Sequence, residues 1–163
     1  MSKAFTKDDA SSDAVVLPTR RPLPTGAPNY VTPRGLESLQ AELRRLHDER
    51  AAVGPSDLDR AHALLVVNAR IRELEERIST AVLVDPTTQS RDEVRFGARV
   101  TVRGEAGEDR TYEIVGVDEA NAAEGRVAFT APIARALLGK RVGDAVTLRT
   151  PRGEEEIELL EIA

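Results

Sequence analysis

The sequence predicts an α+β protein in which an antiparallel coiled-coil hairpin is followed by a small antiparallel sheet with one short helix. Two observations predict this fold. Hydrophobic residues recur with heptad spacing on both sides of a Gly-Pro pair, and they alternate with polar residues from residue 94 onward. We therefore divide the chain into a disordered N-terminal arm (1–28), the hairpin (29–85), a linker (86–93) and a C-terminal domain (94–163).

The composition excludes several classes of protein. The 28 acidic residues outnumber the 23 basic ones, so bulk charge does not favour a protein that coats nucleic acid. The chain has no cysteine, which excludes disulfides and Cys-ligated zinc. No hydrophobic run approaches the roughly 20 residues of a membrane helix, and the N-terminus lacks the hydrophobic core of a signal peptide. We expect a cytoplasmic protein with no membrane partner.

The first 28 residues carry acidic residues, serines and four prolines, with only one short hydrophobic cluster at Val15, Val16 and Leu17. A segment with so little hydrophobic surface cannot offset the entropy that ordering costs. We therefore expect this arm to be disordered.

The first helix of the hairpin has a clear start signal. Thr32 can cap the helix with its hydroxyl, and Pro33 suits the first helical position, where a missing N–H costs nothing. Val31 can pack onto Leu36 as a hydrophobic staple. The heptad positions that follow are Leu36, Leu39, Leu43, Leu46 and Val53.

Gly54 and Pro55 end this helix, and Ser56 is placed to cap a second one, with Asp59 three residues later. The second helix repeats the spacing at Leu64, Val67, Ile71, Leu74, Ile78 and Ala81. Because so few residues separate the helices, they must form an antiparallel hairpin, and roughly 21 residues give each helix a length of about 30 Å. On this pattern alone, a plain dimerisation coil explains the hairpin equally well.

From residue 94 the hydrophobic period changes to two, which predicts five short strands. Between the third and fourth strands, Pro132 opens a short helix over 133–138, and Gly139 ends it. The strands are centred on Val100 and Val102, on Tyr112 and Ile114, on Val127 and Phe129, on Val146 and Leu148, and on Ile157, Leu159 and Ile162.

Several motifs, in this order, resemble the GreA/GreB family of bacterial transcription factors, and the resemblance extends from Asn29 to Ala163. The most specific is P-I-A-R-A-L-L-G-K at 132–140, followed by V-G-D at 142–144. The first seven residues, M-S-K-A-F-T-K, resemble the GreB branch. The other motifs are N-Y-V-T-P-R-G-L at 29–36, F-G-A at 96–98 and Y-E-I-V-G at 112–116.

The resemblance implies a function for the hairpin. In that family the C-terminal domain, similar in fold to FKBP domains, docks at the rim of the secondary channel of RNA polymerase, and the coiled coil enters the channel. Carboxylates at its tip help to hold a catalytic Mg²⁺ while the polymerase hydrolyses the displaced 3′ end of a backtracked transcript. The resemblance thus implies a monomeric accessory factor, without enzyme activity or a cofactor of its own, whose partners are bacterial RNA polymerase and the transcript 3′ end.

The same resemblance assigns a docking surface. In the family, the turn before the short helix contacts the polymerase, and it corresponds here to Thr130, Ala131, Pro132, Ile133 and Arg135. Ala131 stands where the family usually has serine, so we expect a weaker helix cap or weaker docking.

The tip departs from the family pattern. The family pattern resembles G-D-L-S-E-N-A-E-Y, whereas residues 54–62 read G-P-S-D-L-D-R-A-H. Each helix is also shorter than in the family by about seven to nine residues, or roughly 10 to 13 Å. The tip residues are Gly54, Pro55, Ser56, Asp57 and Asp59.

Two interpretations of Asp57 and Asp59 compete. They are replacement ligands for the Mg²⁺ that the polymerase holds, or they are acids favoured by the helix dipole, with Asp59 completing the cap on Ser56. We favour the second interpretation, because helices shortened by roughly 10 Å would leave the tip away from the metal, whereas ligand oxygens must lie about 2 Å from it.

We therefore expect a Gre-type regulator whose shortened coil occupies the channel and stimulates transcript cleavage weakly or not at all. An active cleavage factor is the alternative. Two further alternatives are a polymerase-independent interaction module and an FKBP-like prolyl isomerase, for which Phe96, Tyr112 and Phe129 provide few aromatic rings.

Overall fold

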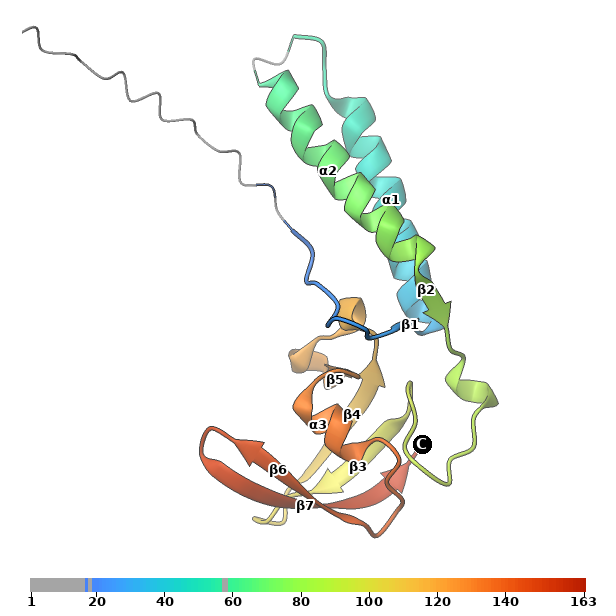
Figure 1. Cartoon of the computed structure of the whole chain (residues 1–163), viewed down its shortest axis with the longest axis vertical. Coiled ribbons are helices and arrows are strands. Elements are labelled where there is room, and N and C mark those ends of the chain that lie inside the picture. Colours follow the sequence, from blue (N-terminus) through green and yellow to red (C-terminus); the bar gives the residue numbers. More distant parts are fainter. Residues whose placement is uncertain (1–16, 18, 57–58) are drawn as a thin grey trace, which may run out of the picture.

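The computed structural model describes residues 17, 19–56 and 59–163. It is an α+β structure in which two long helices project from a small curled sheet (Figure 1). The helical part comprises β1 (Asn29–Val31), α1 (Pro33–Ala52), α2 (Arg60–Ser79) and β2 (Ala81–Leu83). After the 3-10 turn η1 (Pro86–Thr88), the sheet domain comprises β3 (Arg99–Arg103), β4 (Asp109–Val115), η2 (Val117–Glu119), η3 (Ala122–Glu124), β5 (Arg126–Ala128), α3 (Pro132–Leu137), β6 (Ala145–Thr150) and β7 (Gly153–Ile162).

Helix α1 begins as predicted. The Thr32 hydroxyl accepts a hydrogen bond from the Gly35 N–H at 3.0 Å, and Pro33 occupies the first helical position. The two helices lie side by side and run in opposite directions (Figure 1). Their shared core contains the predicted heptad residues except Val53, and Leu39, Leu46, Val67, Ile71 and Leu74 are buried in it.

The predicted cap of the second helix is wrong. Helix α2 begins at Arg60 rather than next to Ser56, and Asp59 is the capping residue. The connection is therefore longer than predicted, and Arg60, the first residue of α2, bridges it: its Nη1 donates to the Val53 carbonyl at 3.2 Å. This contact places a cation at the C-terminal end of α1, where the helix dipole favours it.

A two-stranded parallel sheet at the base of the hairpin was not predicted. Strand β1 pairs with β2, so that Asn29 lies opposite Ala81 and Val31 lies opposite Leu83. Each strand has only three residues, which is too short for an alternating pattern to show in the sequence. The pairing ties both ends of the hairpin together.

The five strands of the main sheet, within the described residues, form at the predicted positions and in the order β5-β4-β3-β7-β6. The prediction of an entirely antiparallel sheet is wrong for one pair, because β5 runs parallel to β4. The physical reason is the crossover through η2 and η3, which brings the chain back beside Glu113, so that β5 runs in the same direction as the last three residues of β4. Helix α3 closes a core that includes Val100, Val102, Ile114, Leu137, Ile157 and Leu159.

The N-terminal arm also differs from its prediction. Residues 19–28 lie against the base of the hairpin, where Arg20 pairs with Glu42 and Asp118. These long-range contacts supply the stabilisation that the local composition lacks. Residues 1–16 and 18 lie outside the described residues. In the described ranges, no helix is both long and hydrophobic enough to cross a membrane.

Candidate functional site

The tip of the hairpin lies at the end of the molecule farthest from the sheet domain (Figure 1). Helices α1 and α2 have 20 residues each, so the tip is about 30 Å from the base of the hairpin. Pro55, Ser56 and Asp59 are exposed there and Gly54 is half-buried, while Asp57 lies outside the described residues.

The tip offers one described carboxylate. Asp59 makes no side-chain capping hydrogen bond to any described residue, so the prediction that it completes a cap on Ser56 is wrong. In the described part of the chain, no group of three or more His, Cys, Asp or Glu side chains could hold a metal ion. A Mg²⁺ bound at this tip would need most of its oxygen ligands from another molecule.

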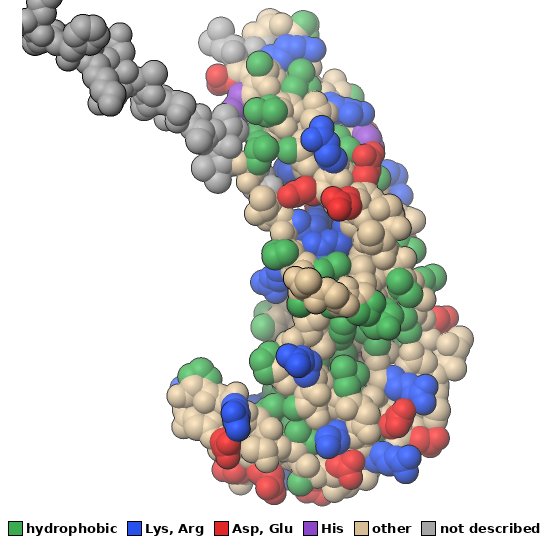
Figure 2. Space-filling model, in the orientation of Figure 1, with side chains coloured by type: hydrophobic (Ala, Val, Ile, Leu, Met, Phe, Trp, Pro, Cys, Tyr) green, Lys and Arg blue, Asp and Glu red, His purple; other side chains and the backbone are tan. Residues whose placement is uncertain are grey.

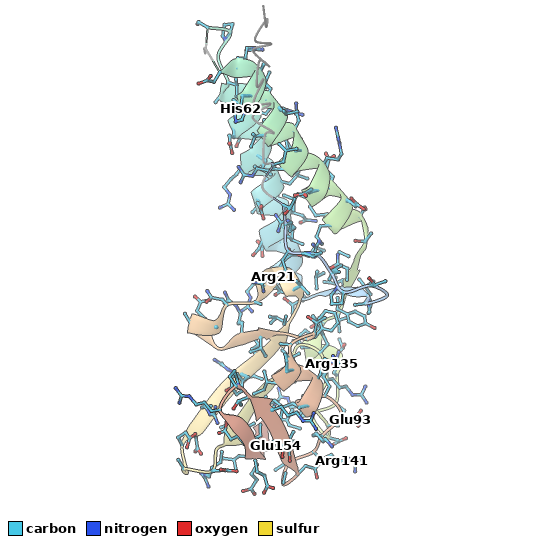
Figure 3. All side chains as sticks on the ribbon, turned by 60° about the vertical axis from the view of Figure 1, so that its left-hand side comes forward. Arg21, His62, Glu93, Arg135, Arg141 and Glu154 are labelled. Atoms are coloured by element: carbon cyan, nitrogen blue, oxygen red, sulfur yellow. The ribbon has the colours of Figure 1, made fainter. Side chains whose placement is uncertain are left out.

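The predicted docking residues lie together at one turn, far from the tip. Helix α3 begins at Pro132, and Ala131 in the capping position makes no side-chain capping hydrogen bond. The first backbone bond of the helix runs from the Arg135 N–H to the Ala131 carbonyl at 2.9 Å. Pro132 and Arg135 are exposed, while Thr130 and Ile133 are half-buried. Figure 3 shows Arg135 on the sheet domain and His62 near the tip, widely separated along the long axis of the molecule.

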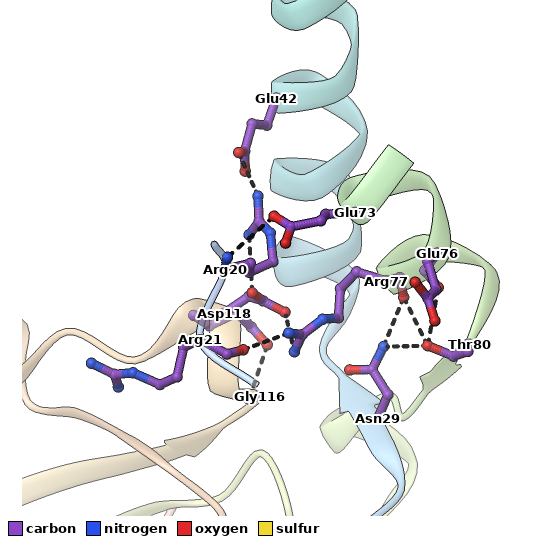
Figure 4. A network of polar contacts seen from close by, with 11 residues as sticks. Arg20, Arg21, Asn29, Glu42, Glu73, Glu76, Arg77, Thr80, Gly116 and Asp118 are labelled. Carbon is purple, nitrogen blue, oxygen red and sulfur yellow. Dashed lines mark hydrogen bonds and ion pairs between the residues drawn. The ribbon is translucent and has the colours of Figure 1, made fainter. Parts of the chain in front are cut away.

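A buried ionic network joins the hairpin to the sheet domain, and sequence reasoning missed it (Figure 4). The Asp118 carboxylate lies between two guanidinium groups, 2.9 Å from Arg20 Nη1 and 3.2 Å from Arg77 Nη1. The side chains of Asp118 and Arg77 are only 7% and 9% exposed. Arg77 lies three residues after Leu74 on the buried face of α2, and this position was the signal available in the sequence.

A second polar contact holds the first turn of α1. The Glu119 carboxylate accepts hydrogen bonds from the Thr32 hydroxyl, from the Thr32 N–H at 3.2 Å and from the Gly116 N–H at 3.2 Å. This acid lies at the N-terminal end of α1, where the helix dipole favours negative charge. Glycine is required at 116, because a Cβ there would lie 2.5 Å from the Tyr30 carbonyl oxygen.

Three aromatic rings pack together at the same junction. The Tyr30, Phe96 and Phe129 ring centroids are 5.5 to 5.7 Å apart. Two of these rings are those considered for a prolyl isomerase pocket, and both contact Tyr30 of β1. Together with the ionic network, they attach the base of the hairpin to the sheet domain on several sides.

The charges at the junction reinforce each other. Burial alone lowers the pKa of Arg20, but hydrogen bonds and charge from Glu42 and Asp118 together outweigh burial and raise it. Arg20 is therefore a permanent cation within a group of acids. Elsewhere on the hairpin, cationic and anionic side chains are interspersed (Figure 2), so the surface shown there has no basic patch of the kind that nucleic acid requires.

The chain is similar in sequence to known proteins. Residues 88–163 match the model of the C-terminal part of the transcription elongation factors GreA and GreB. The chain is 40% identical to the transcription elongation factor GreA of Acidiphilium cryptum over 149 residues, which cover 81% of this chain and 95% of the relative. It is 37% identical to GreB of Neisseria meningitidis serogroup B over 155 residues, with coverage of 85% and 95%.

Among solved structures, GreA factor homolog 1 of Thermus thermophilus is 26% identical with a TM-score of 0.39, and the match covers 84% of this chain and 99% of that chain. The alignment with the Acidiphilium protein spans 149 positions but includes only 81% of the 163 residues, so about 17 positions of that relative have no counterpart here. At this identity and coverage, the chain belongs to the GreA/GreB family of transcription elongation factors.

Proposed function

We propose that this protein binds bacterial RNA polymerase and inserts a shortened coiled-coil hairpin into its secondary channel, where it regulates elongation or initiation with little or no stimulation of transcript cleavage. The observation that carries the proposal is the hairpin itself. Its helices have only 20 residues each, and its tip reads G-P-S-D-L-D-R-A-H.

The missing alignment positions support a short reach. The number of absent positions, about 17, equals the loss of seven to nine residues expected from each of the two helices. If these positions lie in the two helices and the loss is shared equally, the tip ends roughly 13 Å short of the family's position. Inner-sphere oxygens must lie about 2 Å from Mg²⁺, so such a tip stops before the metal.

The sheet domain is the proposed docking unit. It is the FKBP-like part of the family, and the turn from Thr130 to Arg135 is its polymerase-facing surface. Pro132 and Arg135 are exposed on α3 and available to a partner, whereas the neighbouring Ala134 is fully buried and holds the helix in place. Arg135 provides a cation for an acidic surface on the polymerase.

One observation favours a second candidate function, the stimulation of transcript cleavage. The Asp59 carboxylate is exposed and makes no capping hydrogen bond to a described residue, so it can accept a metal ion that the polymerase already holds. This function requires the sheet domain to dock deeper than in the family, by the length that the helices have lost.

Two measurements test these proposals. Tagged full-length protein should retain core RNA polymerase in a pull-down, and Arg135→Glu should weaken the retention. A failure to retain polymerase would contradict the proposed function and favour a polymerase-independent interaction module.

Stalled, backtracked elongation complexes distinguish the two candidates. We expect the protein to bind these complexes without shortening their RNA. Efficient shortening that is lost in the Asp57→Ala, Asp59→Ala double variant would establish the cleavage function instead. The matched control is Glu37→Ala, Glu75→Ala, which removes two exposed acids from the hairpin away from its tip.

A further inference from the structure

The segment that precedes the hairpin lies across its base and contacts both helices and the sheet domain (Figure 4). The backbone N–H of Arg20 donates to Glu73 Oε2 of α2 at 3.2 Å. Its side chain forms ion pairs with Glu42 of α1 and with Asp118 of η2, the latter at 2.9 Å. One residue therefore connects three elements that are distant in the sequence.

The next residue adds a fourth contact. Arg77 Nη2 donates to the Arg21 carbonyl at 2.5 Å, while Arg77 Nη1 lies beside Asp118. The side chains of Arg20 and Asp118 are 21% and 7% exposed, so solvent screens their ion pair much less than one on the surface.

Cavities on both sides show that the segment bridges a cleft. A cavity of about 590 Å³ lies between residues 20–29 and the end of α2, and another of about 480 Å³ lies between Arg20, α1 and residues 118–126. Glu42, Glu73 and Asp118 surround Arg20 within this cleft. Arg77 lines the same cleft, but the three carboxylates outnumber it, so the cleft is electrostatically complementary to the Arg20 cation of the segment.

The covalent connection alone does not fix the hairpin. The chain passes from β2 to β3 through residues 84–98, whose only regular element is the three-residue turn η1. A linker of this kind permits rotation of the helices relative to the sheet unless side chains prevent it. The guanidinium of Arg20 is suited to this task, because its planar fork directs Nη1 to Asp118 and Nη2 to Glu42 at once.

We propose that residues 19–28 form a strap, held by Arg20, that fixes the direction of the hairpin relative to the sheet domain. Arg20 is a positioning residue in this proposal and touches no partner. The strap is a property of the free protein and does not depend on polymerase binding, so its test is independent of the proposed function.

A distance measurement on the full chain tests the strap. Because the sequence has no cysteine, Leu65→Cys near the tip and Val142→Cys on the sheet domain provide two unique sites for spin labels. These side chains are 49% and 57% exposed, so labels there do not disturb the core. Pulsed electron paramagnetic resonance then reports the distribution of distances between tip and domain.

The parent protein should give a narrow distribution, and Arg20→Ala should make it at least about twice as wide, since loss of the contacts releases a segment locally. The matched control is Arg21→Ala, which removes the same charge from an exposed side chain with no ion pair to any residue in the described ranges. It should leave the distribution unchanged. Circular dichroism must show that each variant keeps its helices.

Arg20→Lys provides a second test if the alanine variant fails to fold. A lysine ammonium cannot span both carboxylates in the same geometry, so we expect a distribution of intermediate width. A distribution in Arg20→Ala or Arg20→Lys as narrow as in the parent would overturn the proposal. Equal broadening in Arg20→Ala and Arg21→Ala would also overturn it, because the effect would then not come from the Arg20 bridge.

Discussion

The two ends of the hairpin differ in how their side chains are held. At the tip, Pro55, Ser56 and Asp59 are exposed, and the cation of Arg60 reaches back to the end of α1. At the base, Asp118 is enclosed by two arginines and Thr32 is bonded to Glu119. The difference indicates that the tip sequence can change at little cost in stability, whereas the base determines where the tip points.

The largest expected contrast concerns hydrophobic burial. Leu74 on α2 is fully buried near the base, so Leu74→Ala should reduce the free energy of unfolding by about 2 to 5 kcal/mol. Leu65→Ala, at a site that is 49% exposed near the tip, should change it by less than about 0.5 kcal/mol. Urea unfolding of both variants measures the contrast, and equal losses would contradict it.

The second contrast compares two aspartates. Asp118→Ala should cost about 2 to 3 kcal/mol, because it leaves two partly buried guanidinium groups without their shared carboxylate. The expected value is less than for an isolated buried pair, since Arg20 retains Glu42. Asp59→Ala should be nearly neutral, and a comparable loss in this tip variant would show that the tip is held more firmly than its contacts suggest.

A third prediction concerns the close approach of backbones at the base. Gly116→Ala introduces a Cβ only 2.5 Å from the Tyr30 carbonyl oxygen, so β1 or η2 must shift. We expect a loss of about 1 to 3 kcal/mol in thermal unfolding. Unchanged stability would mean that the junction between hairpin and sheet domain can adjust, which would also weaken the argument for a fixed hairpin direction.

The smallest effect is expected in the linker between the two parts. Hydrogen bonds from the Thr87 hydroxyl and from the Thr87 N–H lower the pKa of Asp85. The charged carboxylate therefore stabilises the folded state above the ordinary Asp pKa of about 3.9, and this contribution disappears as the pH falls through the lowered folded pKa. In Thr87→Val, an NMR titration should show the pKa of Asp85 moved up towards its ordinary value, and no movement would exclude the hydroxyl as its main cause.

Local signals in the sequence predicted much of the fold. Thr32 and Pro33 specify the first residue of α1 through contacts confined to residues 32–35. The heptad spacing identifies the buried face of both helices. The alternating pattern located all five strands that form the main sheet in the described part of the chain. These features depend on neighbouring residues, so periodicity and capping rules detect them.

The features that were missed depend on residues far apart in the chain. Arg20 and Asp118 are separated by 98 positions, and a segment with a disordered composition became ordered through that contact. The parallel pairing of β5 with β4 follows from the path of η2 and η3, which strand periodicity does not encode. The Ser56 cap was wrong because α2 begins at Arg60, three residues later than the capping pattern indicated.

Because α1 and α2 are both 20 residues long, a small tilt at the base of the hairpin moves the tip by a large distance. Over an arm of about 30 Å, a tilt of roughly 10° at the base displaces the far end by about 5 Å. Such a displacement is larger than the distance of about 2 Å between a metal ion and its ligand oxygens. If the Asp118 network fixes the tilt, as proposed above, a mutation at the base moves the tip by several ångströms without any substitution in the tip itself.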